Sequence, residues 1–122
     1  MINNVTLTGR LTAEPEIRYT SNGTPVTTFT LAVNRNFESE QEADFIRMIA
    51  WNKRAEIIAD YLTKGSLIGV EGSIRTRSWE DEDGEWHNIT EVEVRQLTFL
   101  EYRKNDEENT KKKTKKKTTK RK

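Results

Sequence analysis

The sequence contains no cysteine and only one histidine, His87, in 122 residues. The missing cysteines exclude disulfide bonds and thiolate metal sites, and a single histidine leaves little for imidazole chemistry. No run of about 18 apolar residues is present, and the first residues, MINNVTLTGR, have neither the charged lead nor the apolar segment of a signal peptide. We therefore expect a soluble cytoplasmic protein with no membrane segment.

Charge is distributed unevenly along the chain, although the formal net charge is only +1. Residues 1–102 contain 10 lysines and arginines against 17 aspartates and glutamates, a net charge of −7. Residues 103–122 contain 11 against 3, a net charge of +8, and end in KKKTKKKTTKRK, which has no apolar side chain. Composition thus predicts one acidic folded domain over residues 1–102 and a disordered, basic tail over residues 103–122.

Alternation of apolar and polar residues predicts an all-β domain with five strands. The first two strands are separated by the turn-forming stretch TSNGTP, in which Asn22 and Gly23 are typical of a hairpin turn. The last two are separated by a turn at Asp83 and Gly84. The predicted strands are residues 4–11, 28–34, 44–51, 66–79 and 88–100.

One short helix is predicted between the third and fourth strands, with Asn52 as its N-cap and Gly65 at its end. Three strands, a helix and two strands follow one another as in the five-stranded barrel of the oligonucleotide/oligosaccharide-binding (OB) fold. A change of apolar phase in the last strand predicts a bulge near Arg95 or Gln96. A small antiparallel sandwich is the alternative, but five strands are few for one. Glycines within the strands suit the bends of a small barrel, and they are Gly9, Gly69 and Gly72.

Two of the predicted strands alternate arginine with aromatic residues on the side that faces away from the core. In segment 44–51 the period of two gives one apolar face and one mixed face, and segment 66–79 divides in the same way. Bases of single-stranded nucleic acid stack on aromatic rings while arginines meet the phosphates, so the pattern favours nucleic-acid binding. The alternative is that these rings pack under loops or against a partner subunit. The mixed faces comprise Phe45, Arg47, Ile49 and Trp51 in the third strand and Arg75, Arg77 and Trp79 in the fourth.

Three stretches of the chain resemble the bacterial single-stranded-DNA-binding proteins, including those of phages and plasmids. They are VTLTGRLTAEPEIRYTSNGTPVTTFTLAVNRNF, YLTKGSLIGVEGSIRTRSW and TEVEV, and the similarity covers about residues 1–100. The resemblance implies the OB fold, sequence-independent binding and protection of single-stranded DNA in replication, recombination and repair, and neither catalysis nor a cofactor. It also implies a homotetramer around which the DNA wraps.

The resemblance further implies that bases stack on four aromatic residues, which are Phe37, Phe45, Trp51 and Trp79. Trp86, in the predicted hairpin between the last two strands, is a separate candidate that the resemblance does not supply. Two cations near the aromatic positions, Arg35 and Lys53, complete the predicted set. The predicted DNA-binding residues are Arg35, Phe37, Phe45, Arg47, Trp51, Lys53, Arg75, Arg77, Trp79 and Trp86; no catalytic or metal-binding residue is predicted.

Two features depart from the family pattern. Members typically end in a flexible linker and a short acidic, hydrophobic tip that recruits replication and repair proteins, whereas this chain has the basic segment 111–122 in that place. We therefore do not expect recruitment through such a tip. Ile46 also stands where the family often has a histidine at a subunit contact.

Other kinds of site are weaker candidates. The segment WEDEDGEW concentrates five carboxylates, but a calcium-binding loop would place Trp79 and Thr90 at its first and last ligand positions, where neither can bind the ion. An exposed hairpin tip is therefore expected there. The remaining acids are scattered and His87 has no evident triad partners, so a metal-dependent nuclease is not expected.

A last alternative makes the lysine-rich tail the binding site and the barrel purely structural. It predicts that deleting the tail abolishes binding and that duplex DNA competes with single strands. The aromatic faces predict the opposite on both points.

Overall fold

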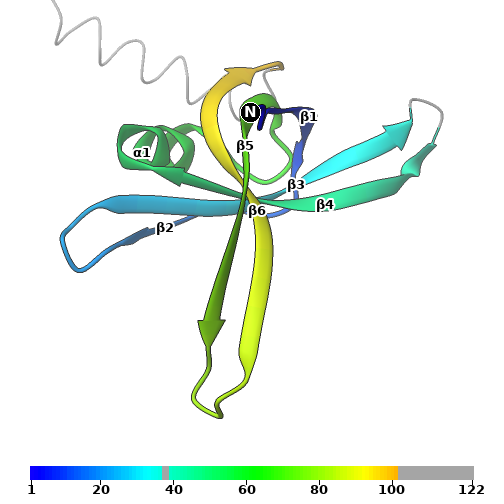
Figure 1. Cartoon of the computed structure of the whole chain (residues 1–122). Coiled ribbons are helices and arrows are strands. Elements are labelled where there is room, and N and C mark those ends of the chain that lie inside the picture. Colours follow the sequence, from blue (N-terminus) through cyan, green and yellow to red (C-terminus); the bar gives the residue numbers. More distant parts are fainter. Residues whose placement is uncertain (37–38, 102–122) are drawn as a thin grey trace, which may run out of the picture.

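The computed structural model describes residues 1–36 and 39–101 (Figure 1). Phe37 and the predicted tail, residues 103–122, lie outside the described residues. Within the described part the chain forms six strands and one helix. The strands are β1 (Val5–Leu11), β2 (Glu16–Tyr19), β3 (Pro25–Asn36), β4 (Ser39–Trp51), β5 (Leu67–Glu80) and β6 (Trp86–Phe99), and the helix is α1 (Asn52–Tyr61).

Five of these strands close into a barrel. Hydrogen-bonded neighbours follow the order β1-β5-β6-β4-β3, and β1 pairs with β3 at Arg10 and Leu11 to complete the ring. The pairing of β4 with β6 is parallel and covers two residue pairs, whereas the other pairings are antiparallel. The predicted five-stranded OB barrel, with its helix between the third and fourth barrel strands, is confirmed.

The short strand β2 was not foreseen. It pairs with β3 outside the barrel ring, and the hairpin between them turns where it was predicted, with the N–H of Gly23 donating to the carbonyl of Thr20 at 2.8 Å. Gly23 has φ +85°, a conformation that glycine adopts without steric cost. In β2 only Ile17 and Tyr19 alternate with charged residues, so the four-residue pattern was too short to identify.

The barrel interior is filled by every second residue of its strands, together with side chains from the helix region. The buried Thr27 ties the helix to β3, because its hydroxyl donates to the carbonyl of Ala55 at 2.7 Å. At Gly9 and Gly72 a Cβ atom would collide with a backbone carbonyl of the neighbouring strand, so these strands approach too closely for any side chain. The core comprises Leu11, Phe29, Leu31, Met48, Ala50, Ile58, Leu62, Ile68, Val70, Val92 and Val94.

Both ends of the helix differ from the prediction. The N-cap is Trp51, with no side-chain cap, and Asn52 is the first helical residue with φ +59°. Asparagine tolerates this left-handed conformation, so Asn52 turns the chain from β4 into the helix instead of capping it. The helix ends at Tyr61, and Gly65, with φ +89°, forms the later turn into β5.

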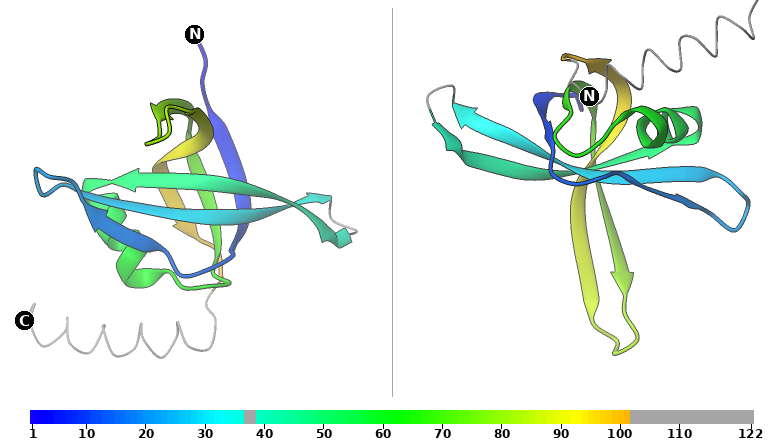
Figure 2. Two further views of the ribbon diagram at one scale, coloured as in Figure 1. Left: turned by 90° about the horizontal axis from the view of Figure 1, so that it is seen from below. Right: turned by 180° about the vertical axis from the view of Figure 1, so that it is seen from behind.

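The β5–β6 hairpin leaves the barrel halfway along its length (Figures 1 and 2). The predicted bulge is confirmed at this point: Glu71 pairs with Gln96 and Gly72 pairs with Val94, so Arg95 has no partner in the register. Beyond Gly72 the hairpin runs away from the barrel core, and its tip turns at Asp83 and Gly84 as predicted. None of the described residues belongs to a helix with the length and hydrophobicity required to cross a membrane.

Candidate nucleic-acid interface

Strand β4 presents its mixed face on the outside of the barrel, as predicted, except that Ile49 on this face is buried. Phe45 is 70% exposed, while Met48 and Ala50 on the opposite face are fully buried. Arg47 and Trp51 are partly buried on the outer face. The aromatic and cationic residues of this strand are therefore on the surface, with Phe45 the most accessible of them.

Strand β5 carries the second predicted row on its projecting half. Arg75, Arg77 and Trp79 are all exposed. The Arg77 guanidinium lies 5.3 Å from the centre of the Trp79 ring. The His87 ring stacks on the same indole, with ring centres 5.4 Å apart and ring planes at 23° to each other. These contacts hold the indole in place while 42% of the residue stays exposed, which suits a surface for stacking.

A row of glutamates on β6 lies between the two predicted rows and was missed. β6 is the neighbour of both β4 and β5 in the sheet. Glu91 accepts a hydrogen bond from Nε of Arg47 at 3.1 Å and another from Nε of Arg77 at 3.0 Å, and Arg75 pairs with Glu93. The alternation in TEVEV was a usable signal, because it places both glutamates on the face opposite the buried valines.

These ion pairs leave the arginines able to bind phosphate. Each guanidinium has five N–H donors, and the hydrogen bonds described for Arg47 and Arg77 use only Nε. Their side chains are 39% and 48% exposed. Glu91 thus holds each of these two arginines through Nε and leaves the terminal N–H groups available to a ligand.

A groove of about 620 Å³ lies where β4 passes into the helix, beside β5 and β6. It brings together three predicted residues from separate elements, Trp51, Lys53 and Arg75. Arg54 also lines it and was missed, although it follows Lys53 directly in the sequence. The cations outnumber the single carboxylate of Glu93, so the groove favours an anion. Its lining residues are Trp51, Asn52, Lys53, Arg54, Ile57, Arg75, Glu93 and Val94.

The Trp51 ring has no polar anchor in the described residues. Its indole Nε1 is buried and has no hydrogen-bond partner there. An unpaired buried donor costs free energy, so the ring stabilises the fold through its apolar area and not through its N–H.

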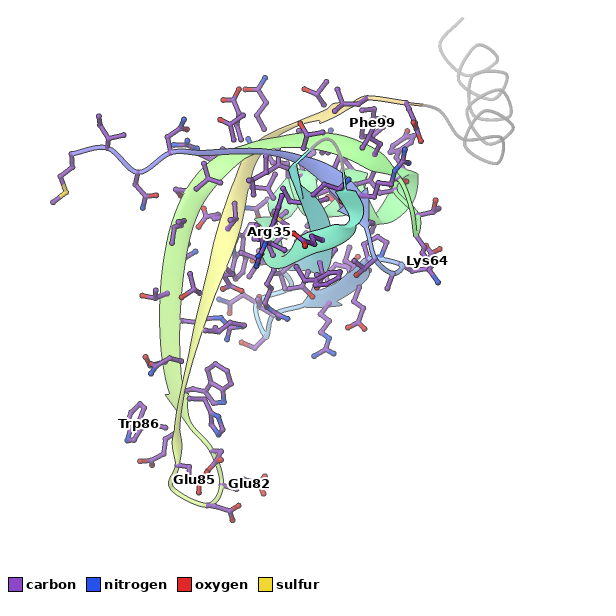
Figure 3. The ribbon with its side chains drawn as sticks, turned by 90° about the vertical axis from the view of Figure 1, so that its right-hand side faces the viewer. Arg35, Lys64, Glu82, Glu85, Trp86 and Phe99 are labelled. Atoms are coloured by element: carbon purple, nitrogen blue, oxygen red, sulfur yellow. The ribbon has the colours of Figure 1, made fainter. Side chains whose placement is uncertain are left out.

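Two predicted residues lie apart from this face. Arg35 pairs with Asp44 at 3.0 Å, and alternation along β3 places it on the same side as the core residue Leu31, opposite to Phe45. Trp86 is 68% exposed but lies opposite Glu80 in the register, so it faces the other side of the hairpin from Trp79. Figure 3 shows Trp86 near the outer end of the hairpin, far from Arg35.

The hairpin tip brings together Asp81, Glu85 and His87, whose possible ligand atoms lie within 4.8 Å of one another. The calcium-loop comparison did not anticipate this grouping. Asp81 accepts hydrogen bonds from the backbone N–H groups of Asp83 and Glu85 at 2.9 Å, and its other oxygen lies 2.7 Å from Nε2 of His87. The His87 contact, followed by the Glu85 N–H, holds the pKa of Asp81 below its usual value. The carboxylate closes the turn.

Comparisons with known proteins agree with this geometry. A curated single-stranded DNA-binding protein of Bacillus cereus is 53% identical over 106 residues, which are 84% of this chain and 62% of that protein. Single-stranded DNA-binding protein A of Bacillus subtilis is 51% identical over 104 residues, 83% of this chain and 60% of that protein. A single-stranded DNA-binding protein of Caldanaerobacter subterraneus is 54% identical over 104 residues, which are 83% of this chain and 69% of that protein.

The chain spans about three fifths of the length of the first two of these relatives. The model of the Single-strand binding protein family matches residues 2–100, which include every element of the barrel. The resemblance found in the sequence is thereby confirmed, and the chain belongs to the single-strand binding protein family.

Proposed function

We propose that this protein binds single-stranded DNA without regard to sequence and protects it, and that it is not an enzyme. The observation that carries the proposal is the continuous outer face of β4, β6 and β5, on which exposed aromatic rings alternate with arginines. The similar proteins are named for binding single-stranded DNA, which supports the same conclusion.

Base stacking supplies most of the binding free energy in this proposal. Each base stacked on an aromatic side chain contributes ~1–3 kcal/mol in single-strand binding proteins, this family among them. The magnitude used for this chain is that general value. Phe45, Trp51 and Trp79 are the described rings on this face. Every base has a π-face, so stacking does not depend on sequence.

Phosphate contacts supply the remainder despite the acidic domain. Two arginines on the side that carries the rings, Arg47 and Arg77, keep their terminal N–H donors available. The cationic groove beside Trp51 adds Lys53, Arg54 and Arg75. Local cations therefore meet the DNA, although residues 1–102 are acidic as a whole.

Three further predicted contacts belong to the same proposal. Phe37, which lies outside the described residues, stacks a base in this proposal. Arg35 and Trp86 contact DNA only where it passes round the β3–β4 or β5–β6 hairpin, because both face away from the central rings. We assign them smaller contributions than Trp51 and Trp79.

We further propose a cytoplasmic homotetramer that acts in replication, recombination and repair. Along Val5–Gly9 the described residues show β1 paired only with β5, since the pairing with β3 is confined to Arg10 and Leu11. Such an open edge can accept a strand from a second copy. Light scattering of the purified protein, expected to give four times the chain mass, tests the assembly.

Quenching of tryptophan fluorescence by oligo-dT, with and without residues 111–122, tests the binding site. We expect the truncated protein to retain quenching, with somewhat weaker affinity and a smaller dependence on salt, because the tail contributes only electrostatically. The double variant with Trp51→Ala and Trp79→Ala should lose several kcal/mol of binding free energy, ~1–3 kcal/mol for each ring, with the tail intact.

Three outcomes would contradict the proposal. Loss of all quenching on truncation, or equal competition by duplex DNA, would assign binding to the tail. Magnesium-dependent degradation of the oligonucleotide would indicate an enzyme.

A further inference from the structure

Glu91 is a buried carboxylate on an otherwise exposed face. Its side chain is 3% exposed, and its two oxygens bind two arginines from different strands: Oε2 binds Arg47 of β4, and Oε1 binds Arg77 of β5. Because β6 lies between β4 and β5, this clamp of Glu91, Arg47 and Arg77 spans the sheet.

The clamp lies at one end of the short pairing between β4 and β6. β4 and β6 are joined by only two residue pairs, Met48–Val92 and Ile49–Glu93, and Glu91 is the next residue of β6 beyond them. The outer part of the β5–β6 hairpin runs away from the barrel, as Figure 1 shows. On β5 the side chains from Ile74 to Glu80 are all exposed. Core packing therefore does not determine the direction of the outer hairpin.

We propose that Glu91 is a positioning residue for DNA binding, which orients the outer hairpin against β4 and holds Arg47 and Arg77 ready for phosphate. The inference rests on the proposed DNA-binding face. Phe45 and Trp51 lie on β4 whereas Trp79 lies on the hairpin, so the angle between these elements sets the spacing of the stacking rings. A spacing determined before binding lowers the entropic cost of binding.

A purely electrostatic role for Glu91 predicts the opposite result. A carboxylate among arginines reduces the positive charge that DNA meets, so its removal would strengthen binding and increase the dependence on salt. If Glu91 instead positions the arginines and the hairpin, its removal weakens binding even though the face becomes more positive. The sign of the effect separates the two roles.

The main test compares Glu91→Gln with Glu93→Gln in the full-length protein, by titration with oligo-dT at several salt concentrations. Both changes remove one negative charge from the same face of β6, but Glu93 pairs with a single arginine, Arg75, among the residues that the structure describes. We expect Glu91→Gln to bind about tenfold more weakly, the equivalent of one charged hydrogen bond, with a smaller salt dependence. Glu93→Gln removes the carboxylate from the lining of the cationic groove and should bind more tightly than the unmodified protein.

Glu91→Asp gives a second and sharper comparison, because it keeps the charge but shortens the side chain by one methylene. The shorter carboxylate cannot reach both Nε atoms, so we expect a loss between those of the unmodified protein and Glu91→Gln. Amide hydrogen exchange of the free variants should be faster in the outer hairpin and unchanged in the barrel core. Both variants should fold, since Arg47 and Arg77 are exposed enough to be hydrated when unpaired.

Each result bears on one conclusion only. Absence of quenching in the unmodified protein would refute the proposed function, whatever the variants do. If the unmodified protein binds and Glu91→Gln binds equally well or more tightly, or if Glu91→Asp is indistinguishable from the unmodified protein, the positioning role is refuted and the DNA-binding proposal stands.

Discussion

The two halves of the β5–β6 hairpin share their strands and, apart from one bulge, their register, yet they differ in what stabilises them. In the barrel half Ile68 and Val70 are buried in the core. In the outer half Ile74, on the same face of β5 as Ile68, is 47% exposed, and the side chains after it are exposed as well. The barrel half is held by apolar burial and the outer half by cross-strand ion pairs and ring contacts.

We infer from this difference that folding stability and DNA binding depend on different parts of the hairpin. Apolar burial is the main source of folding free energy, so changes in the barrel half affect whether the chain folds. The outer half buries little, and its rings and arginines remain available to a ligand. Substitutions there should change binding with little effect on folding.

The largest expected effect comes from replacing one isoleucine by alanine in each half of the hairpin and comparing the two losses of stability. Ile68→Ala removes a fully buried side chain and should lower the free energy of unfolding by ~2–5 kcal/mol. Ile74→Ala should lower it by about 1 kcal/mol or less, because the side chain is already half in water. Urea denaturation of both variants measures the difference, and equal losses would contradict the division of the hairpin.

A second comparison lies within the outer half. Trp79→Ala should weaken oligo-dT binding by ~1–3 kcal/mol while leaving the urea midpoint nearly unchanged. Trp86→Ala, on the opposite side of the hairpin, should weaken binding less. A larger loss from Trp86 would show that the DNA follows the other side.

Trp51 sharpens the comparison from the barrel side, because it combines a partly buried ring with an unpaired indole donor. Trp51→Phe removes that donor and keeps an aromatic face, so stability should stay within about 1 kcal/mol of the unmodified protein and most DNA affinity should remain. Trp51→Ala should lose ~1–3 kcal/mol of binding free energy. A marked loss of stability in Trp51→Phe would reveal a hydrogen bond to the indole.

The smallest effect is expected at the hairpin tip. The pKa of Asp81 is lower in the folded chain than its usual value, so its contribution to stability is complete above about pH 4 and is lost as the pH falls further. Asp81→Asn should therefore lower stability slightly at neutral pH, make almost no difference at acid pH, and so flatten the acid side of the stability profile. Thermal melts between neutral and acid pH provide the measurement, and an unchanged acid limb would argue against a role for this carboxylate.

Much of the fold was predictable because its signals are local. The period of two identified the five barrel strands, the Asn22-Gly23 pair identified a hairpin turn, and a phase change located the bulge that the structure places at Arg95. The same periodicity placed Phe45 and Trp79 on exposed faces. Each of these features depends on residues a few positions apart.

The misses share a different cause. Asn52 was expected to cap the helix, but the sharp turn from β4 required a left-handed residue, and asparagine met that need instead. Strand β2 was too short to identify from its own pattern. Glu91 looked like an ordinary exposed acid of an alternating strand until the sheet order placed it between two arginines.

Local sequence patterns were enough to identify the barrel, the family and the aromatic residues on its outer face, because apolar alternation and turn residues act over short separations. Only the tertiary structure decided which of these residues meet. Glu91 is 44 residues from Arg47 and 14 residues from Arg77 in the sequence. Nothing in these separations reveals that the three residues form one clamp. The physical reason is that strand order and register are set by closure of the whole barrel, which brings distant residues together on one face.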